Sequence, residues 1–219
     1  MVRPRLDGWY RFGRWLSRVF IPTFGTIEVV GRENIPKHGP LIVAPNHQSN
    51  ADPPVLVYAI ERPLYFMAKR TLFANAVVAY LLRSVHVYPI DRDNRDVGGV
   101  RWALGQLKTD HALVVFPEGT RSREGLRRGT AGLAYLAGKS GATILPVAIT
   151  GTEKIEGMFR IAFHFRSLKV VIGEPFTPRA VTGGMNRSEL QAITDEVMGR
   201  VARLLPAEYR GVYGHTYAD

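Results

Sequence analysis

The feature of this sequence that most constrains its fold is the alternation of short apolar runs with longer helical patterns. The apolar runs predict strands over residues 27–30, 41–44, 64–68, 85–90, 113–116, 143–149 and 168–172. The helical patterns predict helices over residues 55–60, 72–82, 97–107, 130–139 and 187–205. Strands that alternate with helices are typical of α/β proteins, so we expect a mostly parallel central sheet flanked by helices.

The length of the chain favours one large domain. Its 219 residues could also form two small domains, but no segment is rich enough in Gly, Pro or Ser to mark a boundary. The sequence therefore predicts a single domain over residues 27–219, preceded by an N-terminal amphipathic segment over residues 1–26. The clearest element is the helix at 187–205, because Asn186 and Glu189 have the spacing of a capping box.

Charge and cysteine content limit the functions open to this chain. Hydrophobic residues make up 46% of it and charged residues 22%, which is typical of a globular protein. The net charge of +10 favours a polyanionic partner, such as nucleic acid, an anionic membrane or an acidic carrier protein. The absence of cysteine excludes disulfides, thiolate metal sites and a cysteine nucleophile.

Residues 8–20 predict an amphipathic helix that ends at Pro22 and Gly25. Its apolar residues recur every three or four positions, at Trp9, Phe12, Leu16, Val19 and Phe20. No transmembrane span is predicted, because the longest uncharged apolar stretch, residues 71–82, is well short of the ~20 residues that a membrane helix needs. Arginines throughout residues 1–20 also argue against a signal peptide, so we expect a cytoplasmic protein.

The first chemical motif is Asn-His-Gln-Ser-Asn-Ala-Asp at residues 46–52. It follows a predicted strand and therefore lies at the edge where open α/β sheets bind ligands. Two prolines after Asp52 favour the first turn of a helix. In a loop that runs into this helix, the Asp52 carboxylate can orient His47 as a general base. The alternative is a helix cap beside an ordinary loop histidine, and the pair alone favours that alternative.

The second chemical motif is Phe-Pro-Glu-Gly-Thr-Arg-Ser at residues 116–122, again after an apolar run. Gly119 allows the backbone to approach a ligand closely, and Arg121 offers planar donors suited to phosphate. Glu118 can bind a polyol hydroxyl or hold Arg121 in place. An ordinary turn with a surface ion pair is the alternative. Together the two motifs indicate a base and an anion site, which are needed to move an acyl group onto the hydroxyl of a phosphorylated acceptor.

In this order and at this separation, the two motifs resemble those of the glycerolphosphate acyltransferase family, in particular the bacterial 1-acyl-sn-glycerol-3-phosphate acyltransferases. The first family motif is matched at Asn46, His47, Ser49 and Asp52, and the third at every position of 116–122. Residues 87–92 are similar to the second motif and residues 144–149 to the fourth. The likeness covers about residues 27–175. One departure is Ser84, where the family often has glycine.

The resemblance implies transfer of a fatty acyl group from acyl-CoA or acyl-carrier protein to the sn-2 hydroxyl of lysophosphatidic acid, which forms phosphatidic acid. His47 is the implied general base and Asp52 its orienting carboxylate, with no metal and no cofactor. Arg92 and Arg121 are implied to hold the phosphate, and Asn46 to help stabilise the oxyanion. The residues implied in substrate binding are Asn46, Arg92, Glu118, Gly119, Thr120 and Arg121, with Ser49, Lys69 and Arg128 as further candidates.

The basic, aromatic helix at residues 8–20 is suited to the headgroup region of an anionic bilayer. With the resemblance, it predicts a peripheral or monotopic protein on the cytoplasmic face of the cell membrane. The expected partners are an anionic membrane surface, a lysophospholipid acceptor and an acyl donor, with no nucleic acid. The alternative for this helix is packing on the sheet. For residues 72–82, core packing is at least as good an explanation as contact with a membrane or an acyl chain.

Four other functions are alternatives to this one. The acceptor could be another lysophospholipid or a glycolipid, since the two motifs recognise hydroxyl and phosphate groups. A non-catalytic lipid-binding protein would not need both His47 and Asp52. A nucleic-acid-binding protein is disfavoured because no recognisable module is present, and a serine hydrolase because no Gly-x-Ser-x-Gly occurs. The remaining histidines are expected to be structural or exposed: His38, His86, His111, His164 and His215.

Overall fold

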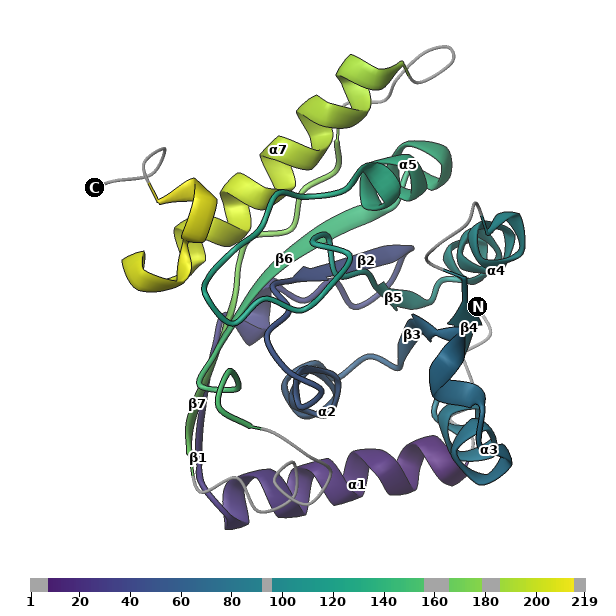
Figure 1. The fold of residues 1–219 in the computed structure, drawn as a ribbon, viewed down its shortest axis with the longest axis vertical. Helices are drawn as coiled ribbons and strands as arrows, with labels where there is room; N and C mark the ends of the chain where they lie inside the picture. The colour runs from purple at the N-terminus through teal and green to yellow at the C-terminus, as the bar shows by residue number, and fades with distance from the viewer. Residues whose placement is uncertain (1–7, 92–95, 156–165, 179–185, 215–219) are drawn as a thin grey trace.

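The computed structural model describes residues 8–91, 96–155, 166–178 and 186–214. Within these ranges it has one sheet of seven strands, in the order β1-β7-β6-β2-β5-β3-β4 (Figure 1). The strands are β1 (Thr26–Val30), β2 (Leu41–Pro45), β3 (Leu64–Lys69), β4 (Val87–Ile90), β5 (Ala112–Val114), β6 (Thr143–Thr150) and β7 (Ser167–Ile172). Neighbouring strands pair in parallel except β6 and β7, which are antiparallel. The predicted mostly parallel sheet is therefore confirmed.

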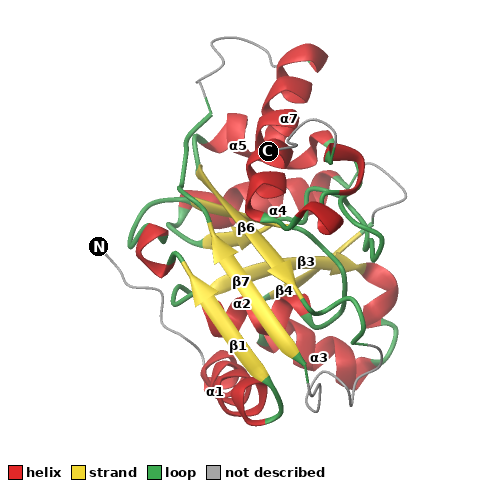
Figure 2. Cartoon of the chain, turned by 90° about the vertical axis from the view of Figure 1, so that its left-hand side faces the viewer, coloured by secondary structure: helices red, strands yellow, loops and turns green. Residues whose placement is uncertain are grey.

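Helices cover both faces of the sheet. They are α1 (Gly8–Thr23), α2 (Asp52–Ala59), α3 (Ala76–Ser84), α4 (Val97–Lys108), α5 (Ala131–Ser140) and α7 (Arg187–Leu204). Helices α1 and α2 pack on one face, and α4, α5 and α7 pack on the other (Figure 1). Figure 2 shows β1, β7 and β6 adjacent to one another, with α1 beyond one end of these strands. The single α/β domain expected from the sequence is thus confirmed.

The central strand β2 is buried on both faces. Leu41 and Val43 pack in the core on the α2 side, whereas Ile42 and Ala44 pack in the core on the α5 side. A strand covered on both faces requires an uninterrupted apolar run, which is the pattern that predicted it. Pro45 is the last residue of β2, and the chain then leaves the carboxyl edge of the sheet in a loop that leads into α2.

Several predicted boundaries differ from the structure by one to three residues, and three of the differences have a local cause. The helix expected over residues 72–82 is divided into a 3-10 turn, η2 (Arg70–Phe73), and α3, because the Asn75 side chain accepts the N–H groups of Val77 and Val78 and starts a new helix. Strand β4 begins at Val87 instead of residue 85, since His86 has a left-handed φ of 64°. Helix α1 continues through Pro22 to Thr23, and the Phe24 N–H still donates to the Phe20 carbonyl at 3.2 Å.

The remaining short elements are 3-10 turns near the ends of longer ones. They are η1 (Arg32–Asn34), η3 (Ala207–Tyr209) and η4 (Gly211–Tyr213). The capping box predicted for the last helix is confirmed, since Asn186 accepts the Glu189 N–H and Glu189 accepts the Asn186 N–H.

Helix α1 is joined to the domain mainly through two buried residues, Tyr10 and Ile21. The Leu64 N–H at the start of β3 donates to the Tyr10 hydroxyl at 2.8 Å, and burial raises the pKa of Tyr10 to about 12. This hydrogen bond uses a strand N–H that would otherwise be buried without a partner. One face of α1 therefore packs on the domain, as the packing alternative expected.

We expect Tyr10→Phe to lower the free energy of unfolding by about 1–3 kcal/mol, because the ring stays in place while the buried Leu64 N–H loses its acceptor. Urea denaturation measures this change. Tyr80→Phe is the matched control, since Tyr80 is 57% exposed and its change should stay within about 0.5 kcal/mol. Equal stabilities for Tyr10→Phe and the unsubstituted protein would show that the hydroxyl does not hold α1 to β3.

Candidate active site

The two chemical motifs leave the sheet from neighbouring strands. β2 and β5 are paired in parallel, with Val43 opposite Val114, so residues 46–52 and 116–122 start from the same edge. The Val115 N–H donates to the Val43 carbonyl at 2.9 Å, which continues the pairing to the last residue before Phe116. The loop that carries His47 and the loop that carries Glu118 therefore begin side by side.

His47 and Asp52 form a buried pair. The distance between His47 Nδ1 and Asp52 Oδ2 is 2.7 Å, and the Asp52 side chain is completely buried. The same carboxylate oxygen accepts the N–H groups of Gln48 and Ser49, at 2.7 and 2.9 Å. With Nδ1 directed at a carboxylate, the ring carries its proton on Nδ1, and Nε2 keeps the lone pair that can take a proton.

The face of the His47 ring is covered by Phe116. The two ring centroids are 3.8 Å apart with an interplanar angle of 23°, and His47 is only 8% exposed. Stacking on one face and a hydrogen bond at Nδ1 together leave the imidazole little freedom to rotate. The His47 ring is thus held in one position by the protein itself.

Glu118 joins the two motifs through their backbones. Its carboxylate accepts the His47 N–H at 2.8 Å and the Arg127 N–H at 2.9 Å. Burial raises the pKa of Glu118 to about 7, although both N–H groups act in the opposite direction. In this structure Glu118 is buried and bound to the backbone, which gives it a role in holding His47 in position.

Further contacts between the loops surround this pair. The Ser122 N–H donates to the His47 carbonyl at 2.8 Å, so both backbone groups of His47 are bound by the second motif. Arg121 is exposed and donates to the Asn50 side chain at 3.1 Å. Gly119 has a φ of 70°, a conformation that favours glycine, and it makes the turn between Glu118 and Arg121 possible.

Two predicted site residues have structural contacts. The Asn46 amide donates to the Ile149 carbonyl at 2.9 Å and accepts the Ile149 N–H at 2.7 Å, so it ties the end of β2 to β6. The Ser49 hydroxyl donates to the Ile155 carbonyl at 2.8 Å and accepts the Ala51 N–H. In this geometry the amide oxygen of Asn46 and one of its two side-chain N–H groups are bound to the backbone of β6.

The structure brings some of the predicted site residues into contact and places others outside this group. His47, Asp52, Glu118, Gly119 and Arg121 are connected by the contacts above. Thr120 and Arg128 are exposed on the segment after β5, and Lys69 is exposed at the end of β3. Arg92 lies outside the described residues.

Sequence reasoning did not single out several residues that contact this site, among them Thr152 and Asn50. The Thr152 hydroxyl donates to Asp52 Oδ1 at 2.6 Å from the segment after β6, about a hundred positions away. Asn50 holds Arg121, as described above. Asn50 lies within the first motif and could have been considered, whereas nothing in the sequence around Thr152 connects it to Asp52.

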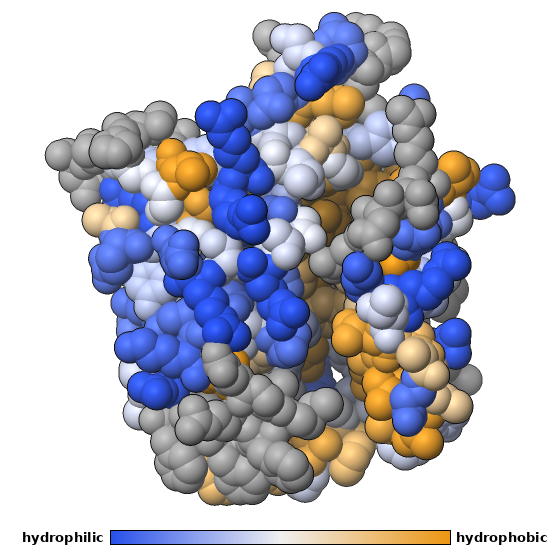
Figure 3. Space-filling model, in the orientation of Figure 1, coloured by the Kyte–Doolittle hydropathy of each residue, from blue (hydrophilic) through white to orange (hydrophobic). Residues whose placement is uncertain are grey.

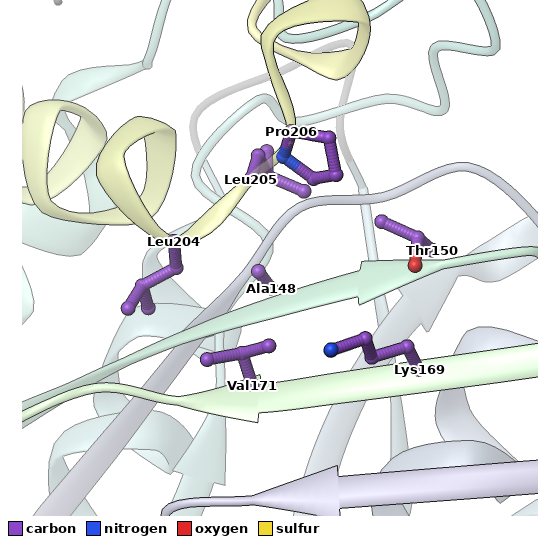
Figure 4. Close-up of a pocket in the computed structure, with 7 residues that line it drawn as sticks. All are labelled: Ala148, Thr150, Lys169, Val171, Leu204, Leu205 and Pro206. Carbon is purple, nitrogen blue, oxygen red and sulfur yellow. The ribbon is translucent and has the colours of Figure 1, made fainter. Parts of the chain in front are cut away.

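A cavity of about 300 Å³ lies apart from these residues, between β6, β7 and the end of α7 (Figure 4). It is lined by Ala148, Thr150, Lys169, Val171 and residues 204–206, and it includes none of the predicted site residues. Among the described residues, no group of three or more His, Cys, Asp or Glu could hold a metal ion.

Several known proteins are similar to this chain in sequence and in fold. The family model described as Acyltransferase matches residues 26–150. The 1-acyl-sn-glycerol-3-phosphate acyltransferase of Bacillus subtilis (strain 168) is 27% identical over 198 residues, which is 89% of this chain and 96% of that protein. The enzyme of the same name from Streptococcus pneumoniae is 27% identical over 175 residues, 78% of this chain and 59% of that protein.

A solved structure agrees with these matches. The crystal structure of the 1-acyl-sn-glycerophosphate (LPA) acyltransferase PlsC from Thermotoga maritima superimposes with a TM-score of 0.67 at 29% identity. The match covers 91% of this chain and 78% of that chain. The family resemblance drawn from the two motifs is therefore confirmed.

Glu118 provides a test of the site's electrostatics. Its pKa is raised from 4.5 to about 7 in the folded protein, so between these values the folded state binds a proton that the unfolded state has lost. The contribution of Glu118 to stability is therefore largest below pH 4.5 and is lost as the pH rises through 7. Glutamine does not titrate, so we expect Glu118→Gln to gain roughly 2 kcal/mol relative to the unsubstituted protein between pH 5 and pH 8.

Urea denaturation of both proteins at these two pH values measures this difference. Glu124→Gln, at an exposed position of the same loop, controls for the loss of a surface charge. A difference that does not change with pH would show that burial does not shift the Glu118 titration.

Proposed function

Because the chain belongs to the acyltransferase family, we propose that it transfers a fatty acyl group to the sn-2 hydroxyl of 1-acyl-glycerol-3-phosphate and forms phosphatidic acid. The observation that carries this proposal is the buried His47–Asp52 pair, held at 2.7 Å beside the second motif. The names of the similar proteins from Bacillus subtilis and Streptococcus pneumoniae support this acceptor. Because the thioester donor is already activated, the proposed reaction needs no cofactor.

In the proposed reaction, His47 acts as the general base. Nε2 takes the proton of the acceptor hydroxyl as its oxygen attacks the thioester carbonyl. The tetrahedral intermediate then collapses, the carbon–sulfur bond breaks, and the imidazolium returns the proton to the departing thiolate. Asp52 stabilises the imidazolium between these two steps, because its carboxylate is bound to Nδ1.

We propose that Arg121 binds the acceptor phosphate. It is exposed at the rim of the site, and its contact with Asn50 holds it on the loop that carries His47. Its planar guanidinium can bind two phosphate oxygens at once. Arg92 is proposed as a second phosphate ligand on the strength of the family resemblance. The exposed Arg127 and Arg128 suit the anionic groups of either acyl-CoA or an acyl-carrier protein.

The exposed apolar side chains of α1, η2 and α3 support binding to a membrane surface. We name them the α1–α3 apolar surface: Trp9, Phe12, Trp15, Val19, Leu72, Val77, Val78, Tyr80 and Leu81, which are between 38% and 68% exposed. Trp9 of α1 contacts Tyr80 of α3 edge to face, with ring centroids 6.1 Å apart, so the two helices form a continuous surface. Figure 3 shows this apolar area over α3, at the lower right of the molecule.

This surface has the composition of an interfacial membrane site. Exposed Arg11 and Arg18 lie on the same helix as Trp9 and Trp15, which is the combination that binds anionic headgroups and inserts aromatic rings. None of the helices in the described part of the chain is long and apolar enough to span a bilayer. We propose that the protein binds the cytoplasmic face of the cell membrane through this surface and takes its acceptor from there.

We expect His47→Ala to lower kcat by roughly 10²–10⁴-fold, because the proposed general base is lost. Purified protein is incubated with mixed acyl-CoA donors and a panel of lysophospholipids, and products are identified by mass spectrometry. His38→Ala, at an exposed histidine, is the control and should keep full activity. Phosphatidic acid formed equally fast by His47→Ala would remove His47 from the role of base. Transfer only to larger headgroups would contradict the proposed acceptor.

We expect the double variant Trp9→Ala/Trp15→Ala to bind anionic vesicles about tenfold more weakly or worse, because two large apolar side chains no longer insert. Sedimentation with phosphatidylglycerol vesicles at low salt measures binding. Tyr135→Ala on α5, also an exposed aromatic residue, should bind as the unsubstituted protein does. Unchanged sedimentation of the double variant would leave α1 with its packing role alone.

A further inference from the structure

We propose that Thr152 is a positioning residue for acyl transfer, and that its hydroxyl fixes the Asp52 carboxylate and, through it, the orientation and proton affinity of His47. The inference rests on the proposed function, since it assigns His47 the role of base. Thr152 lies beyond residues 26–150, which the family model matches.

The hydrogen bonds of Asp52 are divided unequally between its two oxygens. Oδ2 accepts from His47, Gln48 and Ser49, all within six positions of Asp52 in the chain. The bond to Oδ1 comes from the Thr152 hydroxyl, at 2.6 Å. Asp52 and Thr152 are both 0% exposed, so solvent water cannot take the place of a missing hydroxyl.

The local backbone holds Thr152 in this position. Gly151 has a φ of 90°, and a side chain there would collide with the Ser167 carbonyl, so only glycine fits this turn. The Ile155 N–H donates to the Thr152 carbonyl at 2.9 Å and closes the next turn. The turn at Gly151 therefore directs the Thr152 hydroxyl at Asp52.

The same segment supports the first motif at two other points. Ile149 binds the Asn46 amide, and the Ile155 carbonyl accepts the Ser49 hydroxyl. The loop between β2 and α2 has no regular secondary structure of its own before Asp52, so these contacts provide its support from β6. Thr152 differs from the other two because it binds the carboxylate that binds His47.

Loss of the hydroxyl has a predictable electrostatic effect. A donor to Oδ1 spreads the negative charge of the carboxylate, so its removal strengthens the attraction between Asp52 and a protonated His47. Protonated His47 is then favoured over the neutral form that acts as the base, so more of the activity is lost at low pH. Among the described residues, the contacts above place Glu118, Arg121 and Arg127 around the pair, and none of these contacts involves the Thr152 hydroxyl.

The test compares Thr152→Val, Thr152→Ser and Thr150→Val with the unsubstituted protein. Valine keeps the shape of threonine without its hydroxyl, and serine keeps the hydroxyl. Thr150 is the matched control, because it is two positions away and lines the separate cavity at the end of α7 (Figure 4). The measurements are kcat, the acceptor KM, the pH profile of kcat/KM, the melting temperature, and the titration of the His47 ring by NMR.

For Thr152→Val we expect kcat to fall roughly ten- to a hundredfold with little change in the acceptor KM, because the base is misplaced while the phosphate site is intact. The acidic limb of the pH profile and the His47 titration should both move to higher pH. Thr152→Ser should restore both, and Thr150→Val should change neither.

Two results would overturn the inference. One is a Thr152→Val protein with unchanged kcat and an unchanged His47 titration. The other is an equal loss of activity and melting temperature in the valine and serine variants, which would assign Thr152 to packing. The NMR titration needs no substrate, so it separates this inference from the proposed function. If the unsubstituted protein transfers no acyl group but its His47 titration shifts as expected, the function fails and the positioning role stands.

Discussion

The buried charge of Asp52 is the constraint on which the rest of the site depends. A carboxylate removed from water is very costly unless donors surround it, and four donors from two segments meet it here: His47, Gln48, Ser49 and Thr152. The backbone N–H groups among them fix the shape of the loop after β2. Stabilising the charge and orienting the histidine are therefore achieved by the same contacts, and the loop needs no regular secondary structure to hold its shape.

The second motif completes this arrangement through the backbone. Glu118 and Ser122 bind the N–H and the carbonyl of His47, and Phe116 covers its ring. None of these contacts involves the ring nitrogens. His47, the proposed base, is thus fixed on one side by the second motif and on the other by Asp52, while neither set of contacts uses Nε2. The contact with His47 explains why the acid of the second motif, Glu118, is buried and bound to N–H groups.

The sequence predicted the sheet, its helices and the pairing of His47 with Asp52, because these follow from local patterns. Buried strands need apolar runs, and the two prolines after Asp52 place the start of α2. What it could not predict depends on distant contacts. The Asn46 amide could be judged only with Ile149 in view, since any asparagine at a strand exit can point to a ligand or to the backbone. The contact between Thr152 and Asp52 is harder still to predict, because nothing in the sequence around a single threonine indicates which residue it binds.

Helix α1 packs on the domain with one side and is exposed on the other. Adjacent positions on a helix point about 100° apart, so Trp9 faces outward at 47% exposure while Tyr10, at 2%, binds the Leu64 N–H of β3. Leu64 pairs with Ala112 at the start of β5, and β5 leads directly to Phe116 and Glu118. The α1–α3 apolar surface is therefore connected to the candidate active site by hydrogen-bonded strands instead of a flexible link. For the proposed acyl transfer at a membrane surface, a rigid connection of this kind would set how far the acceptor hydroxyl must rise from the membrane to meet His47.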